Sequence, residues 1–379
     1  MKNNNQKKLL SFSVGKKSVI WISTTNKYVV AEPLAAEILE AIQNGNPINQ
    51  IVADCAVRYE ISEEVARPLV MELAEQWKVL GLPEPASRKN SEKSIRQKEI
   101  VPFSVKYYQI NGVIFFVEYE TLFAEQINHP KFGHLEVEAS ENFDHRFQVF
   151  DDGTEFSLWV NNKFIGKWKR TEGHFASGKF SMQVIEKIYG KDESQWIGVF
   201  HAAGISNGKN CAMFFGESGS GKSTLSALLM AAGFDVLSDD FLPVENESAQ
   251  VFRFPAALSI KKKAYDLVTS LFPDLKNAEE HKNPELKKTF RYLAPENRTL
   301  DGVPCKALVM VKYDSSVDFQ MVKLEADEAL THLIPDSWIH PSEANARKFV
   351  QWFTRLEHYR LTYSNNEKMV SAVKELLKE

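Results

Sequence analysis

The chain has few cysteines and no long apolar run, and both shortages narrow its class. Its 379 residues include three cysteines, Cys55, Cys211 and Cys305, which lie far apart and form no Cys-x-x-Cys pair. This spacing argues against a disulfide framework and a cysteine-based zinc site, and it favours a reducing cytoplasm. No stretch reaches the about 18 apolar residues of a membrane span, and the start lacks the apolar segment of a signal peptide. The sequence therefore predicts a cytoplasmic protein with no membrane partner.

An excess of positive charge is also missing. Lysine and arginine total 46 against 50 aspartates and glutamates, so the formal net charge is -4. No global positive field would attract nucleic acid or an anionic membrane, and partners must be selected at local sites. With 44% hydrophobic and 25% charged residues, the composition is that of a globular protein, and the length allows two or three domains. The sequence leaves homo-oligomerisation open.

Residues 1–85 predict a small sheet followed by three helices. Apolar and polar residues alternate over 11–31, which indicates two or three short strands. Apolar residues then recur at helical spacing in 32–45, 46–60 and 61–81, although Pro68 predicts a kink or a later start in the third helix. This order is winged-helix-like.

Three further segments complete the predicted organisation. Half of residues 86–99 are charged, which indicates an exposed linker. Residues 100–174 are rich in strand patterns, with turn signals at Asp152-Gly153 and Asn161-Asn162, and predict an antiparallel β segment packed with the domain that follows. Residues 175–379 alternate helix and strand patterns, typical of an α/β domain. The predicted fold class is thus α/β and α+β multidomain.

The strongest motif is the loop "GESGSGKST", which satisfies GxxxxGK[ST] and stands between an apolar run, "CAMFF", and a helix-like run. Its glycines let backbone N–H groups converge on phosphate oxygens, and the following helix adds its positive dipole end. Lys222 would supply charge to the β and γ phosphates, and the Ser223 hydroxyl would ligate Mg²⁺. The predicted ligands are ATP and Mg²⁺, held by Gly216, Glu217, Ser218, Gly219, Ser220, Gly221, Lys222, Ser223 and Thr224.

Two carboxylates follow the helix after this loop. The strand-like run "FDVLS" closes with Asp239 and Asp240, and strand ends are where α/β sheets place ligand chemistry. One carboxylate could accept a proton from a substrate hydroxyl while the other orients Mg²⁺ or water, and a solvated Asp-Asp turn is the alternative. Asp239 follows Lys222 by only 17 residues, which favours a phosphotransferase over an ABC or AAA motor. His201 stands alone before the loop, where a histidine is more often a core residue.

Taken together, "FHAAG", "GESGSGKST" and "LSDD" resemble the catalytic domain of bacterial HPr serine kinase/phosphorylase and its HprK-like relatives. The resemblance implies that Lys222 and Ser223 hold ATP and Mg²⁺, and that Asp239 is the base for a protein serine hydroxyl. It also implies that His201 is catalytic and that Asp240 joins Ser223 at the metal. HPr kinases usually have Glu where this chain has Thr224, and their later Gly-rich segment with its metal-binding Glu is missing, which leaves the reverse phosphorylase activity unsupported.

A basic segment, residues 285–295, is comparable to one in HprK-like relatives. Its charged residues include Lys287, Lys288 and Arg291, which could neutralise a transferring phosphoryl group. A solvated basic loop is the alternative.

The N-terminal strands and helices resemble PqqD-like peptide-binding domains, which recognise leader peptides of ribosomally made, modified peptides. The resemblance implies that a peptide adds as a strand to an edge of the small sheet. A DNA-binding winged helix is the alternative, but acidic side chains would repel phosphates. The third helix carries four of them, Glu63, Glu64, Glu72 and Glu75, against Arg67 and Lys78. The sequence therefore predicts a peptide partner and no nucleic acid.

These features together predict an ATP- and Mg²⁺-dependent kinase for a Ser, or Thr, hydroxyl of a peptide or small protein, such as a ribosomally synthesised precursor bound by the N-terminal domain. Two alternatives stay open. One is a small-molecule hydroxyl kinase resembling shikimate or gluconate kinases, and the other is a nucleotide-dependent switch or scaffold that transfers no phosphate.

Overall fold

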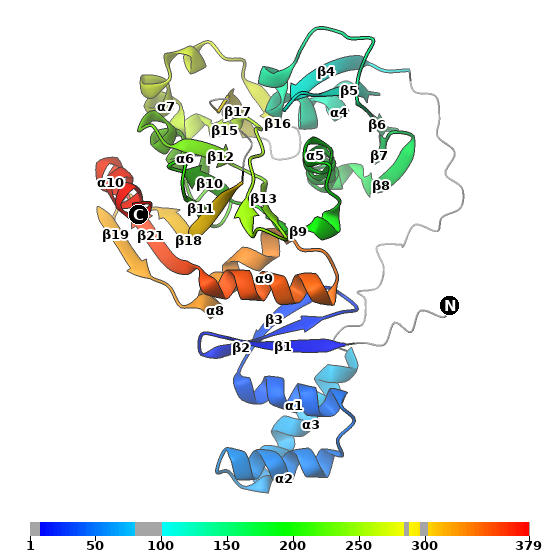
Figure 1. Cartoon of the computed structure of the whole chain (residues 1–379), viewed down its shortest axis with the longest axis vertical. Helices are drawn as coiled ribbons and strands as arrows, with labels where there is room; N and C mark the ends of the chain where they lie inside the picture. Colours follow the sequence, from blue (N-terminus) through cyan, green and yellow to red (C-terminus); the bar gives the residue numbers. More distant parts are fainter. Residues whose placement is uncertain (1–7, 80–100, 284–287, 296–301, 379) are drawn as a thin grey trace.

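The computed structural model describes residues 8–79, 101–283, 288–295 and 302–378 (Figure 1). Over these residues the chain is a mixed α/β protein with four sheets and ten α-helices, so the predicted multidomain α/β and α+β class is confirmed at this coarse level. The predicted linker, residues 86–99, lies outside the described residues.

The N-terminal module consists of a three-stranded antiparallel sheet and three helices, in chain order. They are β1 (Leu9–Val14), β2 (Lys17–Ile22), β3 (Lys27–Ala31), α1 (Pro33–Gln43), α2 (Ile48–Arg58) and α3 (Glu63–Val79). The helices bury apolar side chains such as Leu39, Val52 and Val70 against Ile20 of the sheet. Pro68 lies inside α3, so the prediction of a later helix start is wrong. Pro68 is the sixth residue of α3, so it removes the backbone hydrogen bond that its N–H would donate to Glu64.

The other face of this sheet packs on the C-terminal helices α8 (Ala326–Leu333) and α9 (Glu343–Arg355), and Figure 1 shows the sheet directly beside α9. Val14 and Val19 are buried with Phe349 in one cluster. The sheet is therefore covered on both faces, and its outer face forms part of the C-terminal core.

Trp21 is the largest side chain on that outer face. It is 2% exposed, clusters with Leu10 and Ala346, and donates from Nε1 to Asn26 Oδ1 at 2.7 Å. We expect Trp21→Ala to lower the free energy of unfolding by about 3–5 kcal/mol, because it leaves a cavity between the module and α9. Urea unfolding measures this loss. Lys16→Ala, at an exposed ion pair, is the control and should change stability by less than about 0.5 kcal/mol. Equal stability of the two variants would contradict the docking of the module.

Residues 104–169 form a five-stranded sheet of order β4-β5-β6-β7-β8. Its elements are β4 (Ser104–Ile110), β5 (Val113–Tyr119), α4 (Leu122–Asn128), β6 (His145–Asp151), β7 (Glu155–Val160) and β8 (Lys163–Lys169). The predicted turns at Asp152-Gly153 and Asn161-Asn162 connect β6 to β7 and β7 to β8. The prediction of a wholly antiparallel segment is wrong, because β5 and β6 pair in parallel across the crossover through α4. Helix α5 (Gly173–Tyr189) packs on this sheet.

The remaining chain builds a ten-stranded mixed sheet and a three-stranded sheet. The large sheet contains β9 (Trp196–Phe200), β10 (Ala203–Ser206), β11 (Cys211–Phe215), β12 (Asp235–Ser238), β13 (Leu242–Glu245), β14 (Gln250–Val251), β18 (Val303–Tyr313), β19 (Phe319–Lys323), β20 (Ser337–Trp338) and β21 (Glu357–Tyr363). The small sheet contains β15 (Leu258–Lys261), β16 (His281–Asn283) and β17 (Lys288–Leu293). The further helices are α6 (Lys222–Ala231), α7 (Tyr265–Leu271) and α10 (Asn366–Leu376).

Within the large sheet, β12, β10, β11 and β18 are successive neighbours, and β18 also pairs with β21. Strands β11, β18 and β21 run parallel, so their carboxyl ends meet at one edge. No helix in the described ranges has the length and apolar character to cross a membrane.

Candidate functional site

The glycine-rich loop connects β11 to α6, which begins at Lys222. Three of its glycines have positive φ, +146° at Gly216, +95° at Gly219 and +103° at Gly221, a range that L side chains rarely adopt. A Cβ atom on Gly216 would also lie 2.8 Å from the Val311 carbonyl oxygen. The glycines thus allow the chain to turn tightly from β11 into α6.

Lys222 bends back under this loop. Its Nζ donates to the Gly216 carbonyl at 2.6 Å, and the side chain is largely buried, which lowers the lysine pKa although Asp239 and Asp240 oppose the shift. The Ser220 hydroxyl is buried and has no hydrogen-bond partner among the described residues. An ammonium group, a buried unpaired hydroxyl and a helix N-terminus together fit the oxygens of a phosphate.

Asp239 lies against the first turns of α6, at the end of β12. Its Oδ1 accepts from Ser226 Oγ at 3.0 Å, and it also hydrogen-bonds the Ser223 hydroxyl. Burial raises the pKa of Asp239 to about 6, more than the two hydroxyl groups lower it. The predicted base therefore touches the predicted magnesium ligand Ser223, and the hydrogen bonds it accepts from described residues come from hydroxyl groups.

Asp240 has a different environment. Its Oδ1 lies 2.8 Å from His201 Nδ1, and its Oδ2 lies 3.1 Å from Lys131 Nζ. Burial by itself would raise the pKa of Asp240, but Lys131 and His201 hold it well below its ordinary value. Burial by itself would lower the pKa of His201, but the hydrogen bond and charge of Asp240 raise it. Each carboxylate oxygen thus faces one nitrogen group and keeps a second lone pair, and the role of Asp240 as a magnesium ligand stays a prediction.

Sequence reasoning missed Lys131. It belongs to a 3₁₀ turn, His129–Lys131, that directly follows α4, and its carbonyl accepts from Ala257 N at 2.9 Å. It precedes Asp240 by 109 residues and lies in no recognisable motif, so only the expected packing of the β-rich segment on the α/β domain pointed toward it.

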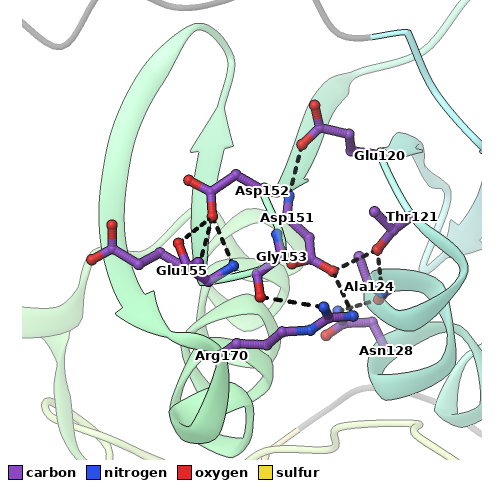
Figure 2. A network of polar contacts seen from close by, with 10 residues as sticks. Glu120, Thr121, Ala124, Asn128, Asp151, Asp152, Gly153, Glu155 and Arg170 are labelled. Atoms are coloured by element: carbon purple, nitrogen blue, oxygen red, sulfur yellow. Dashed lines mark hydrogen bonds and ion pairs between the residues drawn. The ribbon is translucent and has the colours of Figure 1, made fainter.

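A polar network fixes the start of the helix that leads to Lys131 (Figure 2). Thr121 caps α4, accepting from Ala124 N at 3.1 Å, and donates to Asp151 at 2.7 Å. Asp151 also pairs with Arg170 at 3.3 Å, and the Arg170 guanidinium lies over the Phe123 ring. The five-stranded sheet therefore fixes the first turn of α4, and α4 in turn positions Lys131 beside Asp240.

The structure describes two of the three basic residues of the segment 285–295, Lys288 and Arg291. Lys287 lies outside the described residues. Arg291 donates to the Leu275 carbonyl at 3.2 Å and covers the Tyr265 ring, so it is directed toward α7 and the turn after it. Lys288 lies near Lys261, whose pKa is lowered first by burial and then by the Lys288 charge.

The segment after α8, which includes β20, connects the site to the N-terminal module. The backbone N–H of His201 donates to the Asp336 carbonyl at 3.0 Å. Three residues further, the Ile339 carbonyl accepts from Asn26 Nδ2 at 2.7 Å, in the turn between β2 and β3. The short segment around β20 thus contacts both His201 and the module.

The protein alone supplies few metal ligands here. Across the described parts of the chain, no three or more His, Cys, Asp or Glu side chains gather in a group that could hold a metal ion. An Mg²⁺ ion beside the Ser223 hydroxyl would take its other ligands mainly from phosphate oxygens and water, which is how Mg²⁺ commonly binds at nucleotide sites.

Comparison with known proteins identifies the N-terminal module. A family model described as coenzyme PQQ synthesis protein D (PqqD) matches residues 18–82, from β2 through α3. The module is therefore PqqD-like, as the sequence resemblance predicted. No curated protein matches the chain.

Proposed function

We propose that the protein is an HprK-like, ATP- and Mg²⁺-dependent kinase that phosphorylates a Ser or Thr hydroxyl of a peptide or small protein presented by the PqqD-like module. One observation carries the proposal. The loop that fits phosphate oxygens lies beside Asp239, a buried carboxylate that is free of cationic partners within hydrogen-bonding distance among the described residues and contacts Ser223.

Each residue of the site has a separate role in the proposed phosphoryl transfer. The loop N–H groups and Lys222 hold the β and γ phosphates, and the Ser223 hydroxyl orients Mg²⁺. Mg²⁺, when bound, neutralises charge on the phosphate oxygens. The oxygen of the acceptor hydroxyl bonds to the γ phosphorus while Asp239 accepts the hydroxyl proton. The bond between the γ phosphorus and the β-phosphate oxygen breaks, and ADP leaves. Asp240 holds His201 and Lys131 beside this centre.

Lys131 is a positioning residue in this proposal. We expect Lys131→Met to lower kcat for peptide phosphorylation by roughly 10²-fold, since releasing Asp240 and His201 misplaces groups at the reacting centre. The ATP Kd should stay within about threefold of the wild-type value, because the ammonium group of Lys131 is engaged by Asp240 and not by a described residue of the loop. Lys131→Arg should restore part of kcat.

Lys179→Met is the matched control for Lys131. Lys179 lies on α5 and forms an ion pair with Glu193 at 3.0 Å, close to the 3.1 Å of the Lys131 pair. The side chains of Lys179 and Lys131 are similarly exposed, at 27% and 23%. Unchanged kcat in both variants would show that Lys131 is merely a salt bridge between segments.

The PqqD-like module supports a peptide acceptor, since the module resembles peptide-binding domains. In addition, the segment around β20, from Asp336 to Ile339, joins the module to the site. Deleting residues 1–86 would be a poor test, because Val14 and Val19 belong to the C-terminal core and their removal would expose it. The full-length protein is the appropriate reagent.

The test is mass spectrometry of candidate peptides, above all small precursors encoded beside the gene, after incubation with the protein, ATP and Mg²⁺. We expect the mass gain of one phosphoryl group on a Ser or Thr residue. ATP binding without phosphoryl gain on any candidate peptide would overturn the kinase proposal and favour the nucleotide-dependent switch.

A further inference from the structure

An exposed aromatic side chain borders the glycine-rich loop. Tyr313 is the last residue of β18, and its backbone N–H donates to the Ser220 carbonyl at 2.8 Å. A Cβ atom on Gly221 would lie 3.2 Å from the Tyr313 Cβ. The side chain nevertheless stays 52% exposed, and its ring meets the Tyr363 ring edge-on at 5.8 Å. The structure therefore holds an aromatic ring beside the loop and leaves much of it open to solvent.

The sheet order places this ring on one particular flank of the loop. Asp239 and Asp240 follow β12, which is separated from β11 by β10, whereas Tyr313 ends β18 on the other side of β11 (Figure 1). A nucleotide whose terminal phosphate is directed toward the aspartates has its nucleoside at the opposite end. That end lies toward β18, where Tyr313 is the exposed aromatic side chain in contact with the loop backbone.

We propose that Tyr313 is the stacking platform for the base of the bound nucleotide. The inference rests on the proposed nucleotide binding at the loop, but it does not require phosphoryl transfer. Every nucleobase has a π-face, so stacking on a tyrosine ring discriminates little between bases. The site should therefore accept adenine and guanine nucleotides with similar affinity, with the phosphates as the main recognised group.

Binding of ATP and of inorganic tripolyphosphate to the full chain separates the base from the phosphates. We expect Tyr313→Ala to raise the Kd of ATP and of GTP by a similar factor of about 5- to 100-fold, the range of base–aromatic stacking. The Kd of tripolyphosphate should not change, because it has no base and because Ala keeps the backbone N–H that bonds Ser220. Tyr313→Phe should retain wild-type affinity for all three.

Phe103→Ala is the matched control, since Phe103 is 58% exposed and precedes the five-stranded sheet, far from the loop in sequence. An unchanged ATP Kd in Tyr313→Ala would overturn the inference. An equal loss of ATP and tripolyphosphate affinity would also overturn it, because Tyr313 would then shape the loop instead of contacting the base. If the wild-type protein binds none of the three ligands, the proposed function fails and this inference with it.

Discussion

The Lys222→Met variant is expected to lose ATP binding and peptide phosphorylation together. In the wild type, the Lys222 ammonium group lies within the glycine-rich loop, 2.6 Å from the Gly216 carbonyl oxygen. Since a charged hydrogen bond contributes up to about 3 kcal/mol, the ATP Kd should rise by roughly 10²-fold. Phosphorylation at saturating ATP should fall by about 10²- to 10³-fold more, because charge developing on the transferring group loses its partner. Calorimetric titration and steady-state phosphorylation measure the two losses.

Methionine preserves the apolar stem of the buried lysine, so the variant should keep its fold. Its stability should equal or exceed that of the wild type, because a largely buried charge is removed. Urea unfolding without nucleotide checks this point. A folded Lys222→Met variant that binds ATP with wild-type affinity would show that the loop does not hold the phosphates.

Local sequence signals predicted the loop and its surroundings well. The glycines, the strand before them, the helix after them and the aspartates at a strand end all depend on neighbouring residues. Asn161 and Asn162 show the same principle, since both have positive φ and form the turn between β7 and β8. A tight turn is specified by the few residues that form it, so a single sequence suffices to find it.

Long-range contacts were not accessible in the same way. Lys131 reaches Asp240 across 109 residues, and no spacing rule connects them. One signal in the sequence could have predicted that the N-terminal sheet packs on the C-terminal helices. All residues of β2 from Ser18 to Ile22 are buried, and the continuous apolar run Val19–Ile22 is typical of a strand covered on both faces.

The basic segment shows why composition alone does not tell where side chains are directed. In β17 successive residues face opposite sides, so Lys288 and Tyr292 share one face while Arg291 lies on the other. Arg291 therefore reaches Tyr265 and Leu275 although it is close in sequence to Lys288, which lies near Lys261. The charge of the segment was evident from the sequence, but the direction of each charged side chain depended on how β17 pairs with its neighbouring strands.

The Asp239→Asn variant is expected to phosphorylate peptide about 10²- to 10⁴-fold more slowly, the usual contribution of a general base. Asparagine has the same shape and can still accept from Ser226, which donates to Oδ1 at 3.0 Å in the wild type. It cannot accept the proton of the acceptor hydroxyl. The ATP Kd should therefore stay near the wild-type value, and the half-saturating Mg²⁺ concentration should not change. Single-turnover phosphorylation at several ATP and several Mg²⁺ concentrations measures all three quantities.

The Mg²⁺ series decides between two roles for Asp239, because this carboxylate also contacts Ser223. A general base is needed at every Mg²⁺ concentration, so the slow rate should persist at saturating Mg²⁺. If high Mg²⁺ restores the rate and the half-saturating concentration rises by about tenfold or more, Asp239 orients the metal ion and another group accepts the proton. Phosphorylation at the wild-type rate under all conditions would remove Asp239 from the reaction, and Asp240, which holds His201 and Lys131, would become the carboxylate to replace next.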